Sequence, residues 1–387
     1  MLAGQEVPIQ AGAKLTGRIG RTDLGVLSVR TGGEGFDDKE FFVGRVQQSI
    51  LAESSIGTVL TYGNPNQPIE SMTYGVDLRL ATSNFLGRSK NLVFNAFGLR
   101  SQNEGASSGD RSYGASIEYP NDLWEAELTL RVLEENFNPA LGYVPRSGLR
   151  FWRVGGRYSP RPDFLGLEQI YNGIFFNHIT RLSNDQTESW NLFFTIPADW
   201  HFRSGDALHA FLSPDIRYER LFEPFQIAPG VTLPVGEYRF TRFNNNFATS
   251  GRRPLMFMVR YAFGTYWSGS AHELQSTLTY RLPPRFSVSG SANQTFARLD
   301  EGNFVARTFT STVVYAFSPF LSVTNLAQYD NRSRNLGWQG RIRWTPQPGS
   351  DLFLVFNQGW IQDDGSESRF HSGDSKISTK LQYTFRF

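Results

Sequence analysis

The clearest evidence for the fold is one alternating segment, Leu336-Gly337-Trp338-Gln339-Gly340-Arg341-Ile342-Arg343-Trp344. Its even-numbered positions are apolar or small, and its odd-numbered positions are Gly, Gln, Arg and Arg. Because successive side chains of a β-strand point to opposite faces, this segment has one apolar face and one charged face. The alternation predicts a strand that separates an apolar environment from a wet one.

The same alternation recurs from near residue 12 to the end of the chain, in about 21 segments of roughly 9–14 residues. A tilted membrane strand needs about 9–11 residues, whereas strands of soluble proteins are mostly about 5–6 residues long. A soluble sandwich or propeller is the alternative, but no repeat of about 40–50 residues is present. We predict an all-β fold, a large antiparallel transmembrane β-barrel of about 21–24 strands. Residues 1–11 form an N-terminal segment and residues 12–387 the barrel.

The composition agrees with a barrel in lipid. Aromatic residues make up 14% of the chain, yet all hydrophobic residues together make up only 40% and the mean hydropathy is −0.35. Rings that face lipid and polar residues that face a wet lumen account for this combination. No run approaches the ~18 apolar residues of a membrane helix. The net charge of +2 indicates no nucleic-acid surface, and the absence of cysteine excludes disulfides and thiolate metal sites.

The C-terminal segment 376–387 places Ile377, Thr379, Leu381, Tyr383, Phe385 and Phe387 on one face. A last strand that alternates and ends on Phe resembles the signal by which bacterial outer-membrane proteins reach their barrel-assembly machinery. We therefore assign Leu381, Tyr383, Phe385 and Phe387 as an assembly signal. The predicted location is the bacterial outer membrane, with membrane lipid and the assembly machinery as partners.

Turn lengths predict the orientation. In outer-membrane barrels the C-terminus is periplasmic, periplasmic turns are short and external loops are longer. Connections such as Pro283-Pro284 and Ser318-Pro319 are tight, whereas Pro197–Asp206 is long for a periplasmic turn. A barrel of more than about 20 strands has a lumen too wide for its own side chains to fill. A plug would come from the inward-folded loops Glu134–Pro145 or Phe222–Val235, or from another chain.

The strand count also predicts a seam. With about 21 strands and a periplasmic C-terminus, the strand near Gly12–Gly20 runs from outside to inside, whereas single-chain bacterial barrels usually have an even number of strands. Unpaired backbone groups facing hydrocarbon cost several kcal/mol each. We expect either another polypeptide segment that supplies at least one strand, or a gap beside Gly12–Gly20.

Arginine dominates the positions predicted to face the lumen. Of 38 Lys and Arg residues only five are Lys, which leaves 33 Arg. Arg suits fixed, bidentate ion pairs better than Lys does. These residues form either a passage or binding surface for anionic or polyhydroxylated solutes, or an ion-pair lattice that holds the wall in register. The candidate lumen-lining residues are Arg79, Arg131, Arg153, Arg157, Arg239, Arg260, Glu273, Arg281, Arg341 and Arg343.

Catalytic and metal-binding motifs are scarce. The five histidines form no HExxH or HxH pair, and the sequence contains no G-x-S-x-G elbow and no Walker loop. Ser268-Gly269-Ser270 near His272 is a candidate for a serine nucleophile and its base, although a Gly/Ser-rich external turn is favoured. We predict no enzyme, cofactor or metal. The favoured function is a pore, transporter or assembly platform; the alternatives are a structural or docking subunit with an occluded lumen, and a membrane-embedded hydrolase.

Three stretches carry a family resemblance: Val7–Gly20, Phe42–Gln47 and Asn136–Arg146. They resemble stretches of a family of bacterial outer-membrane proteins of unknown function whose full-length members carry a carbohydrate-binding family 9-like domain ahead of a barrel. The resemblance covers the barrel part of that family. It implies a barrel fold and a partner domain on the periplasmic side, and it implies no activity.

Overall fold

The computed structural model describes residues 7–33, 35–66, 70–103, 108–196, 199–209, 214–363 and 369–383. These residues form 26 strands and one turn of 3₁₀ helix, η1 (Phe85–Gly87). Twenty-four of the strands belong to one sheet, and β16 and β17 form a second, two-stranded sheet. The predicted all-β antiparallel class is confirmed. Within the described ranges, no helix has the length and hydropathy to cross a bilayer.

The first compact unit, residues 1–159 and 173–192, is an antiparallel meander. Each strand from β1 to β9 pairs with the next along the chain. Its strands are β1 (Ile9–Ile19), β2 (Thr22–Gly33), β3 (Phe36–Ile50), β4 (Ser54–Tyr62), β5 (Ser71–Thr82), β6 (Leu92–Asn103), β7 (Arg111–Pro120), β8 (Trp124–Leu133), β9 (Leu149–Tyr158) and most of β11 (Asn172–Arg181) and β12 (Thr187–Phe194).

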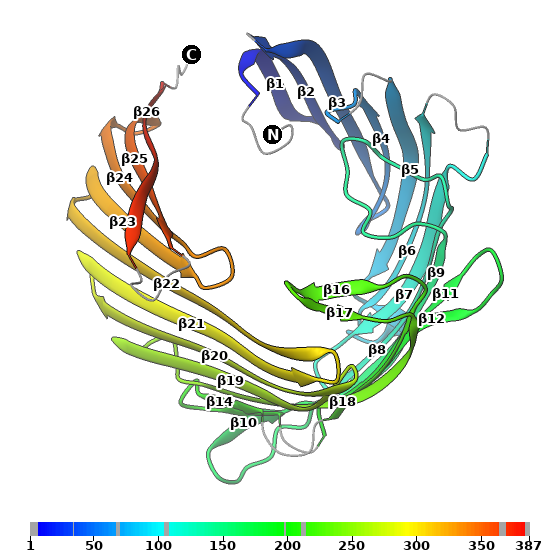
Figure 1. Cartoon of the computed structure of the whole chain (residues 1–387). Helices are drawn as coiled ribbons and strands as arrows, with labels where there is room; N and C mark the ends of the chain where they lie inside the picture. The colour runs from blue at the N-terminus through cyan, green and yellow to red at the C-terminus, as the bar shows by residue number, and fades with distance from the viewer. Residues whose placement is uncertain are drawn as a thin grey trace. The chain divides into compact units, whose positions relative to one another are not determined.

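The second compact unit, residues 160–172 and 193–387, is also antiparallel. Figure 1 shows its hairpin β16–β17 apart from the strands of the large sheet. The strands are β10 (Leu167–Ile170), β13 (Asp199–Phe202), β14 (Ala207–His209), β15 (Pro214–Leu221), β16 (Phe225–Ala228), β17 (Val231–Leu233), β18 (Gly236–Ala248), β19 (Leu255–Tyr266), β20 (Gly269–Leu282), β21 (Phe286–Leu299), β22 (Gly302–Ser318), β23 (Leu321–Asp330), β24 (Asn335–Gln347), β25 (Ser350–Gln362) and β26 (Phe370–Gln382).

Each alternating segment of the sequence contains at least one strand, but four boundaries differ from expectation. The alternating segment near 168–181 divides into β10 and β11 at Tyr171, and the one near 208–221 divides into β14 and β15. The expected connection Pro197–Asp206 contains a strand, β13 (Asp199–Phe202), which pairs with both β10 and β14. A short turn, 203–206, joins β13 to β14. β26 begins at Phe370, six residues before the expected 376.

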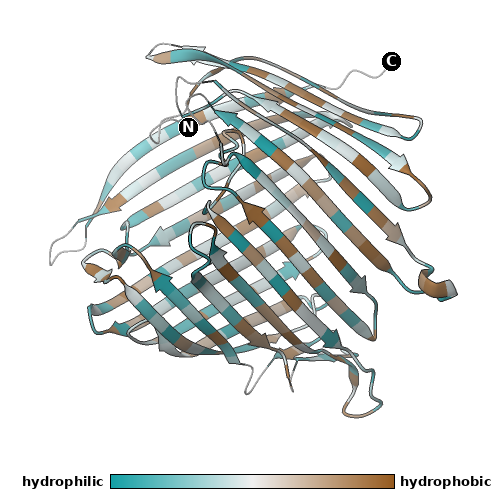
Figure 2. Ribbon diagram, turned by 90° about the vertical axis from the view of Figure 1, so that its right-hand side faces the viewer, coloured by the Kyte–Doolittle hydropathy of each residue, from teal (hydrophilic) through white to brown (hydrophobic). Residues whose placement is uncertain are grey.

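The paired registers give the sheet two chemically different faces. Along the strands, hydrophilic and hydrophobic residues alternate (Figure 2). We call the face that carries Arg45 and Asp77 in the first unit, and Arg242 and Glu273 in the second, the polar face. The opposite face, the apolar face, leaves large side chains exposed, as a surface that lies in lipid does. The alternation in the sequence predicts that six aromatic residues face outward, opposite the charged positions: Trp124, Trp152, Tyr261, Trp338, Trp344 and Phe387. The first five are exposed on the apolar face, at 57%, 38%, 38%, 36% and 49%. Phe387 lies outside the described residues.

Candidate functional site

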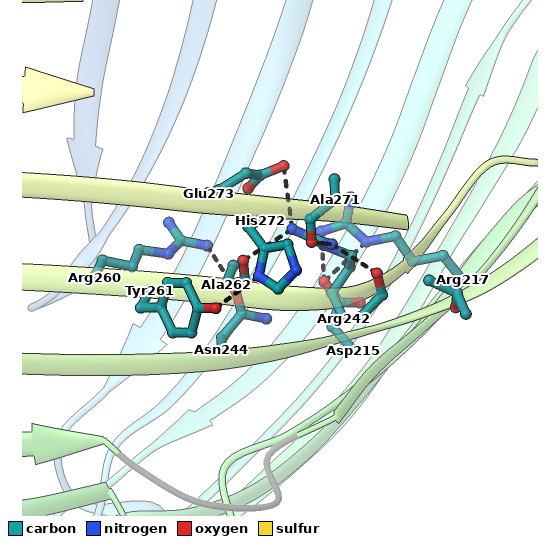
Figure 3. Close-up of polar contacts among 12 residues, drawn as sticks. Asp215, Arg217, Arg242, Asn244, Arg260, Tyr261, Ala262, Ala271, His272 and Glu273 are labelled. Atoms are coloured by element: carbon teal, nitrogen blue, oxygen red, sulfur yellow. Dashed lines mark hydrogen bonds and ion pairs between the residues drawn. The ribbon is translucent and has the colours of Figure 1, made fainter. Parts of the chain in front are cut away.

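The second unit carries a charged cluster on its polar face, centred on a buried arginine (Figure 3). Arg242 on β18 is only 3% exposed. Its Nη1 donates to the carbonyl of Ala271 at 2.7 Å, and its Nη2 donates to the carbonyl of Ala262 at 3.2 Å. Nη2 also lies 3.4 Å from a carboxylate oxygen of Glu273 on β20. The hydrogen bonds and the ion pair offset the cost of burying the charge.

Small residues make room for this guanidinium. The β18–β19 register sets Arg242 opposite Gly264, and the β19–β20 register sets Gly264 opposite Ala271. Neither neighbour has a side chain beyond Cβ, so the Arg242 side chain can lie flat across β19 and reach carbonyls of β19 and β20. The ring of Tyr266 lies 5.3 Å from the guanidinium carbon and closes the contact as a cation–π pair.

A second ion pair flanks the first. Asp215 on β15, 5% exposed, lies opposite Arg242 in the β15–β18 register. Its carboxylate accepts a hydrogen bond at 2.9 Å from Nε of Arg217. The cluster thus contains two arginines and two carboxylates from β15, β18 and β20. Its charge is balanced, which indicates a role in fixing strand register.

The internal segment Phe222–Val235 packs onto the polar face above this cluster. Leu233 is fully buried and Val231 is 4% exposed, and both belong to one apolar cluster with Ala271, Ala297 and Leu299 of the sheet. Tyr238, Tyr266 and Trp267 pack around it. This candidate plug segment therefore lies against the polar face of its own unit, and its role as a plug stays a prediction.

The loop Glu134–Pro145 also folds against its own unit. Phe137 is 5% exposed. The backbone N–H of Asn138 donates to Ser101 Oγ at 2.9 Å, and Nδ2 of Asn103 donates to the carbonyl of Asn138 at 3.1 Å. Ser101 and Asn103 lie on the polar face of β6. The second candidate plug segment therefore also contacts the polar face of its own unit, and its role as a plug stays a prediction.

Three of the predicted lumen-lining arginines form ion pairs. Arg153 Nε lies 2.6 Å from Glu127, and Arg343 Nε lies 2.9 Å from Asp351. Arg157 pairs with Glu125 at 2.5 Å, directly across the β8–β9 ladder. Ion pairs of this kind are what the interpretation as a register-holding lattice predicts, and the interpretation as a solute passage stays a prediction.

Other predicted residues lie on the polar face without a carboxylate. Arg260 donates to Asn244 Oδ1 at 3.1 Å. Within the described ranges, four further predicted residues form no ion pair: Arg79, Arg131, Arg281 and Arg341. These guanidiniums remain available to solutes or to a partner.

Arg239 is the exception among the predicted residues, and its predicted placement on the lumen face is wrong. The register pairs Arg239 with Tyr218, and Arg242 with Asp215, so Arg239 and Arg242 lie on opposite faces of β18. The guanidinium of Arg239 stacks 5.7 Å from the ring centre of Tyr218. The apolar residues Tyr238 and Phe240 occupy the polar face here because the internal segment covers it.

Sequence reasoning missed Arg45, whose guanidinium makes two hydrogen bonds to Asp77, one of them 2.9 Å between Nη2 and Oδ1. Arg45 lies on β3 and Asp77 on β5, so the pair crosses β4. It crosses at Gly57, where a Cβ would collide with the guanidinium of Arg45. The glycine opposite Asp77 in the β4–β5 register is the signal that could have located this pair.

The structure does not bring Ser268 and His272 together as a nucleophile and base. Ser268 Oγ donates to a carboxylate oxygen of Glu301, and Nδ1 of His272 pairs with the Tyr261 hydroxyl at 2.6 Å. His272 lies on the apolar face, opposite Phe263 and Phe296. The described part of the chain contains no group of three or more His, Asp and Glu side chains placed to hold a metal ion.

The proposed assembly signal is described only in part. Leu381 is 73% exposed and pairs with Leu352 across the β25–β26 ladder, and Tyr383 is 55% exposed. Phe385 and Phe387 lie outside the described residues.

Two solved structures are similar to this chain. A ferric enterobactin receptor (PfeA) mutant from Pseudomonas aeruginosa superposes with a TM-score of 0.51 and 10% sequence identity, over 93% of this chain and 72% of the receptor. The ferric-catecholate import receptor Fiu from E. coli K12 gives a TM-score of 0.47 and 8% identity, over 97% of this chain and 73% of the receptor. The sequence matches no protein-family model and no curated protein. The fold is that of an outer-membrane receptor barrel, which confirms the predicted fold class and agrees with the predicted outer-membrane location.

Proposed function

We propose that this chain is an outer-membrane β-barrel that passes solutes through a polar lumen narrowed by its internal segment Phe222–Val235. One observation supports this most strongly. In both units one face is lined by charged, hydroxyl and amide groups while the other exposes large apolar side chains, such as Val76 at 58% and Leu278 at 50%. Only a protein with lipid on one side and water on the other needs both faces. The ferric enterobactin receptor named above has a similar fold.

The internal segment supports a restricted passage. Leu233, Val231 and Ala228 are anchored in the apolar cluster with the sheet, so the hairpin β16–β17 is held against the wall. A hairpin fixed in this way narrows a lumen permanently, in contrast to a mobile external loop.

Single-channel recording in planar bilayers tests the proposal. We expect the full chain to conduct, and a variant in which residues 224–234 are replaced by a short Gly-Ser linker to conduct at least twofold more. A matched variant in which Pro319-Phe320, in the β22–β23 turn, is replaced by Gly-Ser should conduct as the full chain does. Absence of conductance in both the full chain and the 224–234 variant would contradict the pore.

The chain offers a second, independent test because it has no cysteine. Thr279 and Leu278 are neighbours on β20 that point to opposite faces, and Leu278 is 50% exposed. We expect Thr279→Cys to react with a membrane-impermeant thiol reagent in reconstituted vesicles, and Leu278→Cys to be protected by lipid. Equal reactivity at the two positions would contradict the assignment of the faces.

The alternative of a docking subunit with an occluded lumen is supported by cations that lack carboxylate partners on the second unit. Arg281 and Arg341 form no ion pair with another described residue, and an acidic partner would complete them. In that case the isolated chain and its native complex should differ in conductance. A serine-hydrolase probe tests the remaining alternative; the separate partners of Ser268 and His272 argue against labelling.

The partners that we propose follow from the barrel and from the family resemblance. They are membrane lipid, the assembly machinery that would read Leu381–Phe387, and a further polypeptide segment that supplies a strand, a plug or a periplasmic domain. We further propose that residues 12–387 act as one barrel belonging to the family with a carbohydrate-binding family 9-like domain. The gene's upstream sequence tests this: a β-sandwich domain encoded there supports it, and an unrelated upstream reading frame contradicts it.

A further inference from the structure

A hollow of about 520 Å³ lies on the second unit where β23, β24, β25 and β26 run side by side. This volume lies within the range of small-molecule sites. Most of its lining residues come from the polar face of these strands and from the β23–β24 turn. They are Leu326, Gln328, Asp330, Ser333, Asn335, Gly337, Trp338, Gln339, Asn357, Gln358, Gly359 and Asp374.

The hollow exists because two glycines lie opposite one another. Gly337 on β24 pairs with Gly359 on β25. A Cβ on Gly337 would meet no atom within 4 Å, and a Cβ on Gly359 would meet only backbone of Asp374, at 3.6 Å. The floor is therefore bare backbone, and a larger residue at Gly337 would fit the strand while filling the space.

The next pair of residues along the ladder fixes two amides beside this floor. Nε2 of Gln339 donates to Oδ1 of Asn357 at 2.9 Å. Each amide has a second polar atom, so this bond leaves the Gln339 carbonyl as an acceptor and the Asn357 NH₂ as a donor. Gln328 and Asp374 make no side-chain hydrogen bond with other described residues. The lining thus offers donors and acceptors in close pairs.

The charge of the lining limits the ligand. Among the described residues, the ionisable groups that line it are Asp330 and Asp374. Lys376, opposite Asn357 on β26, and Arg341, two residues beyond Gln339 on β24, lie beside it on the polar face. The neighbouring strands β21 and β22 add no charge, because their polar faces carry Ser289, Ser291 and Asn293, and Thr308, Thr310 and Thr312. The two carboxylates and the two cations balance, so neither an anion nor a cation is favoured here. A neutral hydroxyl, which both donates and accepts, matches a carbonyl beside an NH₂ group.

We propose that this hollow binds a neutral polyhydroxylated solute, an oligosaccharide of a few rings. It rests on and deepens the proposed function by naming a solute class, the polyhydroxylated one of the two classes that the sequence indicated. Asp330 is engaged by the backbone N–H groups of Arg332 and Ser333, at 2.7 and 2.8 Å. The unengaged groups of Gln328, Gln339, Asn357 and Asp374 are therefore the ones that would contact the sugar.

Isothermal titration of the purified full chain in detergent micelles tests the proposal with three trisaccharides of equal length. They are neutral maltotriose, anionic trigalacturonate and the cationic fully deacetylated chitotriose. We expect saturable binding of maltotriose and at least tenfold weaker binding of trigalacturonate. No saturable binding of maltotriose, equal binding of trigalacturonate, or tenfold tighter binding of the cationic sugar would overturn the proposal.

Two variants locate the site. Gly337→Val should weaken maltotriose binding at least tenfold by filling the hollow, and Asn357→Leu should weaken it about 3- to 10-fold by removing one neutral hydrogen-bonding group. The matched control is Gly290→Val, since Gly290 on β21 also has no atom within 4 Å of a Cβ but lies on the apolar face. Heat-modifiable gel mobility verifies folding of all three variants. Unchanged binding by folded Gly337→Val would overturn the assignment.

The binding and conductance measurements test the solute site and the pore independently. A chain that conducts but does not bind maltotriose retains the proposed pore and loses this site. A chain that binds maltotriose with the expected response to Gly337→Val, but does not conduct, retains the site and loses the pore.

Discussion

The polar faces of the two units are built in different ways. In the first unit, carboxylates neutralise arginines on the wall: Arg45 pairs with Asp77, Arg153 with Glu127 and Arg157 with Glu125. In the second unit, the wall of β20 to β24 is mostly hydroxyl and amide. Arg343 pairs with Asp351 there, but Arg281 and Arg341 form no ion pair with a described residue. The buried Arg242 on the nearby β18 pairs with Glu273.

This difference between the two polar faces separates two functions of the arginines, which are holding strand register and contacting solutes. Ion pairs between strands hold the strands in register, but they neutralise the charges that could otherwise bind a solute. A neutral wall leaves its hydrogen-bonding groups available. We infer that the first unit is the more scaffold-like wall and the second the more solute-facing one.

The largest expected effect comes from the buried arginine. Arg242→Leu should lower the free energy of unfolding by about 3–5 kcal/mol, because it leaves Glu273 and the carbonyls of Ala262 and Ala271 without their donor. Arg341→Leu, on an exposed strand with no ion pair among the described residues, should change it by less than about 0.5 kcal/mol. Urea titration followed by tryptophan fluorescence measures both. Equal costs would remove the distinction between buried and available arginines.

The apolar faces should behave alike in both units. Leu128→Arg on β8 and Ile342→Arg on β24 should each cost about 2–4 kcal/mol near the bilayer midplane. Thr279→Arg on β20, at a partly exposed position of the polar face, is the control and should cost far less. The same urea titration, in lipid vesicles, measures all three. A cost at Thr279 as large as at Ile342 would contradict the assignment of the faces in the second unit.

Ion pairing in the first unit should be measurable but small. Arg45 and Asp77 side chains are each 36% exposed, so their coupling in a double-mutant cycle should be about 0.5–1 kcal/mol. It should fall in 1 M salt, because the Debye length shrinks to about 3 Å. A cycle between Arg341 and Asn357 in the second unit should give no coupling. Coupling that is insensitive to salt would show that solvent does not reach the pair.

The smallest effect concerns a turn of the second unit. Asp206 accepts hydrogen bonds from Arg253 at 2.7 Å, from Ser204 at 2.7 Å and from the N–H of Ser250 at 2.8 Å, and these lower its pKa from 3.8 to about 2. A lowered pKa stabilises the fold above the unfolded value and is lost as pH falls through the folded one. The stability difference between the full chain and Asp206→Asn should therefore be constant above about pH 4 and shrink toward pH 2. Unfolding titrations between pH 6 and 2 measure it.

Arg253→Gln, which removes the first partner, should flatten the same pH dependence. If the two variants keep a constant difference from the full chain down to pH 2, the turn contact does not exist in solution.

Much of the architecture is predictable from alternation alone. The segment around Trp338 and Arg341 divides its residues between faces as the sequence indicates, and Trp124 and Trp152 are exposed on the predicted side. The reason is that a strand between lipid and water has one face in each solvent along its whole length, so apolar and polar residues alternate.

Alternation failed where the protein covers its own polar face. Between Gly236 and Ala248 the apolar residues change phase, from Tyr238 and Phe240 to Phe243 and Phe247, and Arg239 was placed wrongly for that reason. A side chain buried by the internal segment is as apolar as one buried by lipid, so the pattern cannot tell them apart. The hollow also could not be predicted from the sequence, because it depends on which two glycines become neighbours across a β-ladder.

The pair that crosses β4 above Gly57 has a mechanical consequence. Hydrogen-bonded ladders resist separation of adjacent strands, but each ladder fixes only one neighbour relative to another. Arg45 and Asp77 tie β3 directly to β5, so a shift of β4 by one register step would have to stretch two ladders and would bring a side chain beneath the guanidinium. The pair therefore acts as a diagonal brace, and it stiffens three strands against sliding more than its small equilibrium energy suggests.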